Sequence, residues 1–472
     1  MQKIKFLWLR EDFRLNDNPA YQAISNSDEK FQIFYSFDEK KFKERSAQRW
    51  WLYQTLQKLE KQLSEKGILF TIYASDEIAT IKNIARSQTV GSIYCNELYE
   101  PNEIKKDLAI EAFLKVENIE FRKFKGNLLQ SPFSIKKKDG TPFQVFTPYW
   151  RNAEEQYLKG ANYSKKISKF KAKPVNNNNK EILEQCIKPK KIGIKNLKNT
   201  GALVKNLRNY YLRNLLITKF LSTQPIEIFP LLQEHQGCHP TLLLEKYPLN
   251  TFLMNVTKFQ KKNIGFRKYI NEIGWREFAH HLINHFPDME TGNLRKQFDK
   301  FKWVKDNNKL KKWKMGMTGY PIVDAGMREL YETGWMHNRV RMITASFLVK
   351  HLRIHWMEGE KHFRDSLLDF NTANNIAGWQ WVAGCGADAA PYFRIFNPIL
   401  QGEKFDPEGI YVKQWVKELS NVPKKFIHKP WELPGEESEK INFNLEKDYT
   451  KPIVKHEEAR KLALQAFADL KK

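Results

Sequence analysis

The chain has 472 residues, and its 79 lysines and arginines outnumber 54 aspartates and glutamates to give a formal net charge of +25. No apolar run approaches the ~20 residues that a bilayer-spanning helix needs, so the sequence excludes a membrane protein and predicts a globular one of two or three domains. The basic excess favours a polyanionic partner, with nucleic acid ahead of a membrane surface. A lysine-rich, AT-biased genome is the alternative explanation.

Short apolar runs alternate with amphipathic stretches over the first 130 residues. Strands separated by helices in this way predict an open parallel α/β sheet, which is Rossmann-like. No G-x-G-x-x-G follows the first run, so a dinucleotide-binding fingerprint is absent. The predicted strands are Ile4–Leu9, Phe31–Phe37, Ile68–Tyr73, Ser92–Cys95 and Ile119–Phe121, and the clearest helices between them are Ala47–Lys66 and Asn102–Val116.

The composition changes after this region. Residues 159–200 are rich in lysine and include four consecutive asparagines, which is typical of a solvated connector. Beyond residue 263 the periodicity is helical. We therefore predict an α/β domain over 1–130, a linker over 131–200 and an all-helical domain over 201–472. The predicted helices of the last domain are Lys268–Phe286, Gly326–Glu332, Met336–Trp356 and Gly359–Leu368.

Residues 214–257 do not match their surroundings. These 44 residues contain two basic side chains, Lys219 and Lys246, where the average of the chain predicts about seven. Four prolines interrupt every candidate helix. The segment is either genuinely divergent or translated out of frame between two compensating insertions or deletions.

The four cysteines are widely separated, so their spacing predicts neither a disulfide framework nor a Cys-x-x-Cys metal site. We expect no bound metal. The opening sequence MQKIKFLWLRED reaches charged residues too early for a signal peptide, which predicts a cytoplasmic location. The cysteines are Cys95, Cys186, Cys238 and Cys385.

Two helical stretches carry unusual combinations of side chains. Glu272, Trp275 and Arg276 share one helix face, which is either a surface stripe with an ion pair or part of a binding site. Asn338 and Met342 also share a face, and together they could line a pocket for an uncharged ring system. The alternative is that Met342 only fills the core.

A polar loop rich in glycine and alanine follows over residues 369–406, and such a loop between helices is a candidate ligand site. Three stretches, GWMHNRVRMITASFLVKHL, NNIAGWQWVAGCGADAAPYFRIFNP and QGEKFD, resemble the photolyase/cryptochrome family. The opening LWLREDFRLNDNPAYQAI resembles the start of the family's antenna domain. The resemblance covers nearly the whole chain except residues 214–257.

The resemblance implies a light-dependent DNA repair enzyme with FAD bound in the helical domain. Asn338 and Met342 are similar to a pair in class I cyclobutane pyrimidine dimer (CPD) photolyases, whereas (6-4) photolyases and animal cryptochromes carry a histidine at the first position. Photoexcited reduced FAD would donate an electron to a dimer flipped out of the duplex. A cryptochrome-like flavin photoreceptor without repair activity is the alternative function.

The same resemblance assigns roles to single residues. The implied catalytic residues are Glu272, Asn338, Met342 and Asn375. The implied dimer or DNA contacts are Glu272, Trp275, Arg276, Asn338, Arg339, Trp381 and Gln401. The implied FAD contacts are Tyr269, Arg341, Asp369, Phe370, Asn371 and Asn375, and the implied electron-transfer tryptophans are Trp379, Trp356 and Trp303, from proximal to distal. Asn371 departs from the family pattern, which has an aspartate there.

Asn102 and Glu103 resemble an Asn-Glu pair that binds a methenyltetrahydrofolate antenna in some relatives, so 5,10-methenyltetrahydrofolate is the expected antenna. A Cys-Lys pair that assists in one relative is replaced here by Glu290 and Thr291, and a deazaflavin or flavin antenna stays open. The expected partner is damaged DNA, bound by a monomer without an obligate protein partner and associated with the nucleoid.

The family's FAD-phosphate motifs belong in the segment where this chain has residues 214–257, and both are missing. A shift of two bases in the back-translated segment permits sequences similar to both motifs, which supports the out-of-frame explanation. If the chain exists as written, we expect weak or absent FAD retention and low activity.

Overall fold

The computed structural model describes residues 3–15, 18–26, 30–159, 179–189, 264–389 and 394–471. The anomalous residues 214–257 lie outside this part of the chain. The described residues fall into two compact units. Unit 1 contains the described residues up to 189, together with 264–287 and 371–374, and unit 2 contains the described residues of 288–370 and 375–471. Residues 264–287, which we assigned to the helical domain, thus group with the sheet, while the domain boundaries at 130 and 200 stay a prediction.

Unit 1 is built on a five-stranded parallel sheet with the strand order β3-β2-β1-β4-β5. The predicted parallel α/β sheet is therefore confirmed, with each strand within a few residues of its predicted position. The order reverses at β1, which pairs with both β2 and β4. The strands are β1 (Ile4–Leu9), β2 (Phe31–Ser36), β3 (Phe70–Tyr73), β4 (Val90–Asn96) and β5 (Glu120–Phe124).

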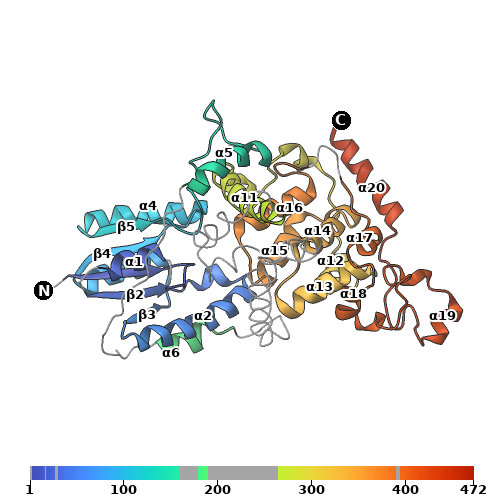
Figure 1. The fold of residues 1–472 in the computed structure, drawn as a ribbon, viewed down its shortest axis with the longest axis horizontal. Coiled ribbons are helices and arrows are strands. Elements are labelled where there is room, and N and C mark those ends of the chain that lie inside the picture. Colours follow the sequence, from blue (N-terminus) through green and yellow to red (C-terminus); the bar gives the residue numbers. More distant parts are fainter. Residues whose placement is uncertain are drawn as a thin grey trace. The chain divides into compact units, whose positions relative to one another are not determined.

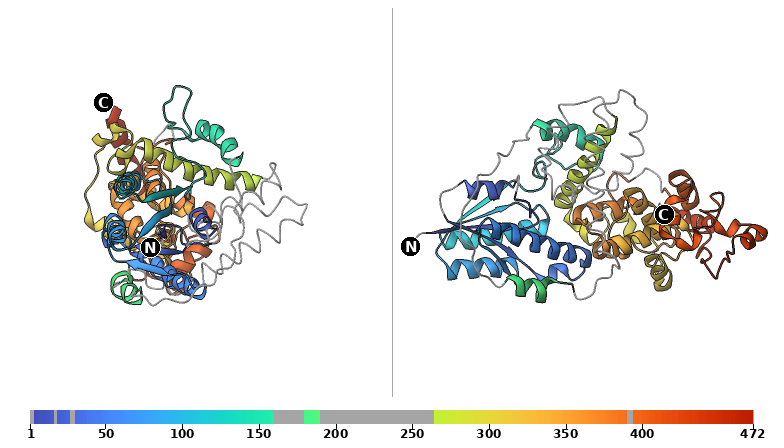
Figure 2. Two further views of the ribbon diagram at one scale, coloured as in Figure 1. Left: turned by 90° about the vertical axis from the view of Figure 1, so that its left-hand side faces the viewer. Right: turned by 60° about the horizontal axis from the view of Figure 1, so that its bottom comes forward.

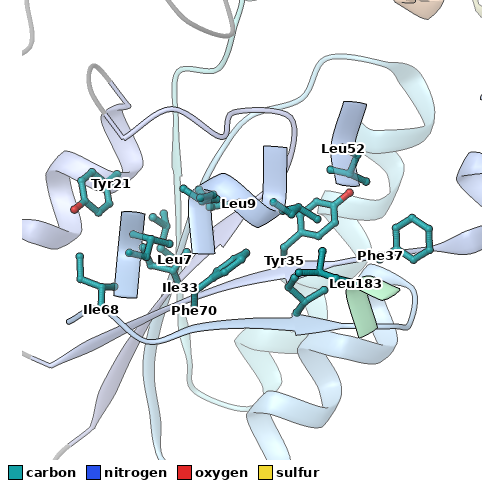
Figure 3. Close-up of a cluster of buried hydrophobic side chains, with 14 of the residues drawn as sticks. Leu7, Leu9, Tyr21, Ile33, Tyr35, Phe37, Leu52, Ile68, Phe70 and Leu183 are labelled. Carbon is teal, nitrogen blue, oxygen red and sulfur yellow. The ribbon is translucent and has the colours of Figure 1, made fainter. Parts of the chain in front are cut away.

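Helices cover both faces of the sheet (Figure 1). Alternate side chains of a strand point to opposite faces, so Leu7 and Leu9 of β1 pack with α1 and α2, as Figure 3 shows in part, whereas Phe6 and Trp8 pack with α3 and α4. This double burial explains why the strands appear in the sequence as continuous apolar runs. The helices are α1 (Pro19–Ser25), α2 (Ser46–Glu65), α3 (Glu77–Ser87), α4 (Pro101–Val116) and α6 (Asn179–Ile182).

Two further helices of unit 1, α5 (Phe146–Lys159) and α11 (Ile264–His285), pack against each other. Gly274 of α11 faces the indole of Trp150 on α5, and a Cβ atom at Gly274 would stand 2.7 Å from that ring. The two helices therefore approach closely at this point. This contact sets the orientation of α11, the helix that carries several of the predicted site residues.

Unit 2 is entirely helical within its described residues. Figure 2 shows its helices in yellow, orange and red. No helix in the described part of the chain is both long and apolar enough to cross a membrane. The helices are α12 (Asn307–Lys314), α13 (Pro321–Thr333), α14 (Asn338–Ser346), α15 (Trp356–Ser366), α16 (Thr372–Ala383, whose first three residues group with unit 1), α17 (Pro398–Phe405), α18 (Ile410–Trp415), α19 (Gly435–Lys440) and α20 (His456–Ala468).

One helix prediction is wrong. We expected a single helix over Met336–Trp356, but α14 ends at Ser346, a π-helical turn follows over Phe347–His351, and α15 begins at Trp356. Arg353 between them adopts a left-handed φ of 52°, which an α-helix cannot contain. The break separates Trp356 from α14 and makes it the first residue of a new helix.

Candidate functional site

Two of the three predicted electron-transfer tryptophans are buried where α15 and α16 pack together. Trp379 of α16 lies against the backbone of α15, because a Cβ atom at Gly359 would stand only 2.1 Å from Trp379 Cη2. Trp356 precedes Gly359 by three residues and so lies on a similar side of α15. Both indoles are buried. Glycine at 359 is what allows Trp379 to lie this close to the helix.

His355 connects the middle and distal tryptophans. Its ring centroid is 5.7 Å from that of Trp356 and 4.9 Å from that of Trp303. Its Nδ1 accepts a hydrogen bond of 3.2 Å from the backbone N–H of Met357, which caps α15. Trp303 is half-buried. The structure therefore connects the middle and distal tryptophans through His355, while Trp379 packs against the helix that begins with Trp356.

Arg341 and Asp369, two predicted FAD contacts, form a buried ion pair in unit 2. Arg341 Nη2 lies 3.0 and 2.8 Å from the two carboxylate oxygens of Asp369. Arg341 Nε donates to the carbonyl of Met336 at 2.7 Å. The carboxylate is fully buried, whereas the guanidinium keeps some exposure. The ion pair thus holds the Arg341 guanidinium of α14 in a fixed position and balances its charge.

Asn375 is held by a second ion pair. Its Nδ2 donates to Glu360 Oε1 at 3.1 Å, and Glu360 also accepts two hydrogen bonds from Arg364 Nη2, each 2.9 Å long. Because the nitrogen of the amide is turned towards Glu360, its oxygen is the atom that can accept a hydrogen bond from a ligand. Neither Glu360 nor Arg364 was among the predicted residues, although their i, i+4 spacing signals a helical ion pair.

The remaining predicted FAD contacts have varied surroundings. Phe370 is buried, with the Arg364 guanidinium 5.8 Å from its ring centroid. Asn371 Oδ1 accepts hydrogen bonds from Asn374, 3.1 Å from its backbone N–H and 2.8 Å from its side chain. The amide thus fills the capping role at the start of α16 that an aspartate would also fill. The side chain of Tyr269 lies outside the described residues.

These residues fit a flavin chemically. An arginine, an amide oxygen and buried aromatic rings are the groups that hold a polar, planar ring system. The Nε1 of Trp379 is buried, and the described part of the chain provides no hydrogen-bond partner for it. A buried polar atom of this kind calls for a partner outside the described residues, and a bound cofactor would be one such partner.

In unit 1, α11 carries three of the predicted lesion or DNA contacts. Trp275 is half-buried and stacks on Phe146 of α5, with ring centroids 3.9 Å apart and planes 9° from parallel. This stack fixes the orientation of the indole and covers one of its faces. Glu272, one turn earlier, is partly buried. Both side chains are accessible enough for a ligand to reach.

Arg276 differs from its neighbours on α11 because it is buried. Its Nη1 lies 2.7 Å from Glu277 Oε1, and its Nη2 donates to the carbonyl of Asn127 at 2.5 Å. Glu277 in turn accepts the backbone N–H of Leu129 at 3.0 Å. The guanidinium therefore ties α11 to the segment that follows the sheet, and its predicted contact with DNA stays a prediction.

In unit 2, the first two turns of α14 present Asn338, Arg339 and Met342, all half-buried. His337 caps the helix by accepting the backbone N–H of Arg339 at 3.0 Å. The Arg339 guanidinium lies 4.9 Å from the ring centroid of Phe405 on α17, the helix that also carries Gln401. The structure therefore links the predicted contacts of α14 to that of α17.

Trp381 is half-buried at the end of α16, where its Nε1 donates to the carbonyl of Asp388 at 3.1 Å. Asp388 has a left-handed φ of 51°. The turn over residues 384–389 thus folds back to hold the indole in a fixed orientation.

A buried carboxyl group near Arg341 was missed in the sequence. Glu329 of α13 accepts a hydrogen bond of 2.6 Å from the Tyr411 hydroxyl. Burial raises the pKa of Glu329 to about 8, against the opposing influence of Tyr411 and Arg341. No periodicity signals this pair, because the two residues are 82 positions apart in the chain.

Replacing Glu329 with glutamine should change how stability depends on pH. The unfolded pKa of glutamate is ~4.3, so the folded protein holds an extra proton between about pH 4 and the folded value of about 8. The free energy of unfolding must therefore fall as pH rises through this window. We expect the free energy of unfolding of Glu329→Gln, taken relative to wild type, to rise by roughly 1–3 kcal/mol between about pH 5 and pH 8. Chemical denaturation at the two pH values measures this change. If the free energies of unfolding of the variant and wild type differed by the same amount at both pH values, a buried, protonated Glu329 would be contradicted.

The predicted antenna pair lies at the start of α4. Asn102 is exposed, whereas Glu103 is buried and accepts from Arg10 at 3.1 Å, Lys41 at 3.2 Å and Lys106 at 2.9 Å. Burial alone would raise its pKa, but Lys41, Lys106 and Arg10 together lower the pKa of Glu103 to about 2. Glu103 is therefore an ionised acceptor at the carboxyl end of the sheet, where α/β folds bind ligands.

Comparisons with known proteins identify the family of the chain. The family model described as DNA photolyase matches residues 6–171, and the model described as the FAD binding domain of DNA photolyase matches residues 269–469. A deoxyribodipyrimidine photo-lyase of Agrobacterium fabrum is 37% identical over 99% of this chain and 98% of that protein. Cryptochrome-2 of Arabidopsis thaliana is 31% identical over 99% of this chain and 79% of its own length.

A similar fold is found among solved structures. The crystal structure of a bacterial class III photolyase from Agrobacterium tumefaciens matches with a TM-score of 0.84 and 33% identity, over 100% of this chain and 98% of that one. The match includes both the parallel sheet and the helical region. This chain belongs to the DNA photolyase/cryptochrome family.

Proposed function

We propose that this chain is a light-dependent DNA photolyase that repairs cyclobutane pyrimidine dimers by electron transfer from photoexcited reduced FAD. The observation that supports the proposal is the packing of Trp379 against α15, the helix that begins with Trp356, together with the placement of His355 between Trp356 and Trp303. Relatives named deoxyribodipyrimidine photo-lyase support it.

FAD would be held by Arg341, Asp369 and Asn375, and Tyr269, Phe370 and Asn371 are proposed as further contacts. When bound, FAD supplies the light-driven electron that splits the dimer. Asp369 keeps Arg341 in place without leaving an unbalanced charge. Glu360 orients the amide of Asn375 so that its oxygen can accept a hydrogen bond from the ring system.

The dimer must leave the base stack before electron transfer, and this family is among the enzymes known to flip bases. Trp275 and Trp381 are proposed as aromatic surfaces for the flipped bases, each held in orientation by its own contact, with Phe146 and Asp388 respectively. Glu272 and Asn338 are proposed to hydrogen-bond the dimer, with Met342 packing against it. Such groups act by favouring the transient charge on the dimer over its ground state.

The basic composition is expected to provide affinity for phosphates, which should weaken strongly as salt concentration rises. We further propose that the chain acts on damaged DNA as a monomer, in the cytoplasm and at the nucleoid. The assignment to class I stays a prediction, since the matching solved structure is described as class III.

The repair proposal can be tested with the flavin-loaded protein on oligonucleotides that contain either a thymine cyclobutane dimer or a (6-4) photoproduct. We expect light-dependent loss of the first lesion only. Glu272→Gln should lower the yield about tenfold, because it removes the carboxylate acceptor. Glu436→Gln on the exposed α19 is the matched control and should repair as wild type.

The second candidate is a cryptochrome-like photoreceptor, which the similarity to cryptochrome-2 favours. It would show light-dependent flavin reduction with neither lesion lost. Repair of the (6-4) photoproduct alone would instead replace the proposed lesion.

For the antenna we propose 5,10-methenyltetrahydrofolate, with the ionised Glu103 accepting hydrogen bonds from the pterin and the amide of Asn102 donating or accepting them. Mass spectrometry of the chromophores released by denaturation tests this proposal. A folate is expected at a lower level in Glu103→Ala than in wild type. A deazaflavin or a second flavin would contradict it.

A further inference from the structure

The middle tryptophan differs from its two neighbours in the hydrogen bonding of its indole. Trp356 Nε1 donates to Asn293 Oδ1 at 2.9 Å, and Asn293 Nδ2 donates in turn to Asp299 Oδ1 at 2.7 Å. The Nε1 atoms of Trp303 and Trp379 are buried, and the described residues offer them no hydrogen-bond partner. A chain of two hydrogen bonds thus connects one buried indole to an exposed carboxylate.

Asn293 is held rigidly in the position that this contact requires. It is buried in the segment before Trp303. Gln380, the fully buried residue after Trp379, donates to the carbonyls of Met289 and Gly292 at 2.8 Å each and accepts the backbone N–H of Leu294 at 2.9 Å. The same helix that carries Trp379 therefore fixes the segment that presents Asn293 to Trp356.

This arrangement favours positive charge on Trp356. A hydrogen bond becomes stronger when its donor is charged, so the bond to Asn293 should strengthen when the indole loses an electron. The carboxylate of Asp299 polarises the amide in the same direction. An amide oxygen is too weak a base to remove the proton, so the charge would stay on the ring.

We propose that Asn293, oriented by Asp299, is a positioning residue that stabilises the one-electron oxidised form of Trp356 during photoreduction of the flavin. The inference rests on the proposed function. A bound, photoexcited flavin would be the oxidant, and Trp379 would give it one electron. Trp356 then gives one electron to Trp379, and Trp303 gives one to Trp356. No covalent bond breaks, and the proton stays on Nε1 throughout.

His355, which also lies beside the Trp356 indole, does not oppose the stabilisation of positive charge on that indole. Burial lowers the pKa of His355 from its usual value, so the imidazole is neutral near pH 7. Its Nδ1 already accepts the N–H of Met357, which places its single proton on Nε2. The ring between Trp356 and Trp303 therefore adds no positive charge.

Asn293→Leu tests the proposal, because leucine has a similar shape and no acceptor. Two readouts are needed: the indole N–H band in the ultraviolet resonance Raman spectrum, which requires no flavin, and transient absorption of the oxidised tryptophan in flavin-loaded protein. We expect the band of one tryptophan to shift and the rate of photoreduction to fall about tenfold. Gln297→Leu, an exposed substitution in the same segment, should leave both unchanged.

A double variant, Asn293→Asp with Asp299→Asn, exchanges the two groups and keeps the hydrogen-bonded chain. It should restore at least half of the wild-type rate. Should Asn293→Leu fail to fold, Asp299→Asn alone should still slow photoreduction about twofold to fivefold, because the exposed carboxylate acts through the amide.

Three results would each overturn the inference: photoreduction at the wild-type rate in Asn293→Leu, no shift of its indole Raman band, or no recovery of the rate in the double variant. If wild-type protein with bound flavin shows no photoreduction, the inference falls together with the tryptophan series of the proposed function. A normal wild-type rate with an unaffected variant overturns the inference alone.

Discussion

Replacing Arg341 with leucine is expected to lower the free energy of unfolding by about 3–5 kcal/mol, because the fully buried carboxylate of Asp369 loses its partner. The same change removes the cation proposed to face the flavin, so flavin retention should also fall. Chemical denaturation and flavin absorbance after gel filtration measure the two effects.

Two variants control this result. Exposed Arg460→Leu should change stability by less than about 0.5 kcal/mol. The double variant Arg341→Leu with Asp369→Leu should recover much of the lost stability, since a buried pair replaced by apolar residues leaves no isolated charge. A stable Arg341→Leu protein that still retains flavin would contradict the role assigned to this pair.

Replacing Gly359 with alanine is expected to have the second large effect. The added Cβ would stand 2.1 Å from Trp379 Cη2, so the indole or the helix must move. Overpacking of this kind typically costs about 1–3 kcal/mol, more than the ~1 kcal/mol that alanine gains in helix propensity. Because the proximal indole is displaced, photoreduction should fall at least severalfold.

Gly378→Ala is the matched control, because this glycine precedes Trp379 on α16 and a Cβ atom added to it would meet no atom within 4 Å. It should be neutral or stabilising by up to ~1 kcal/mol. Equal effects of the two substitutions on photoreduction would contradict the close packing of Trp379 on α15.

The sequence was sufficient for the sheet and for the family. The inner strands are short apolar runs bounded by turns, and burial on both faces makes such runs easy to recognise, as with Ile4–Leu9. Spacing also places Asn338 and Met342 on one helix face, and both lie in α14, but their roles come only from the family resemblance. The family and fold predicted from the motifs are confirmed by the comparisons.

Other features depend on tertiary packing and could not be predicted. The expected helix over 336–356 keeps a helical pattern and contains no proline, yet it is broken by the π-helical turn and by the left-handed Arg353. Glu329 meets Tyr411, and Trp356 meets Asn293, across 82 and 63 positions of the chain. Arg276 lies on the predicted face of α11, but burial against Asn127 gives it surroundings that its spacing does not reveal.

We propose above that this protein repairs cyclobutane dimers in light. The most direct measurement is the loss of a thymine-dimer oligonucleotide in light and in darkness, with this chain and with a version in which residues 214–257 are restored to the alternative frame. We expect light-dependent loss of the dimer by the restored version, and weaker activity and flavin retention in the chain as written. No loss of dimers in light with the flavin-loaded restored version would contradict it.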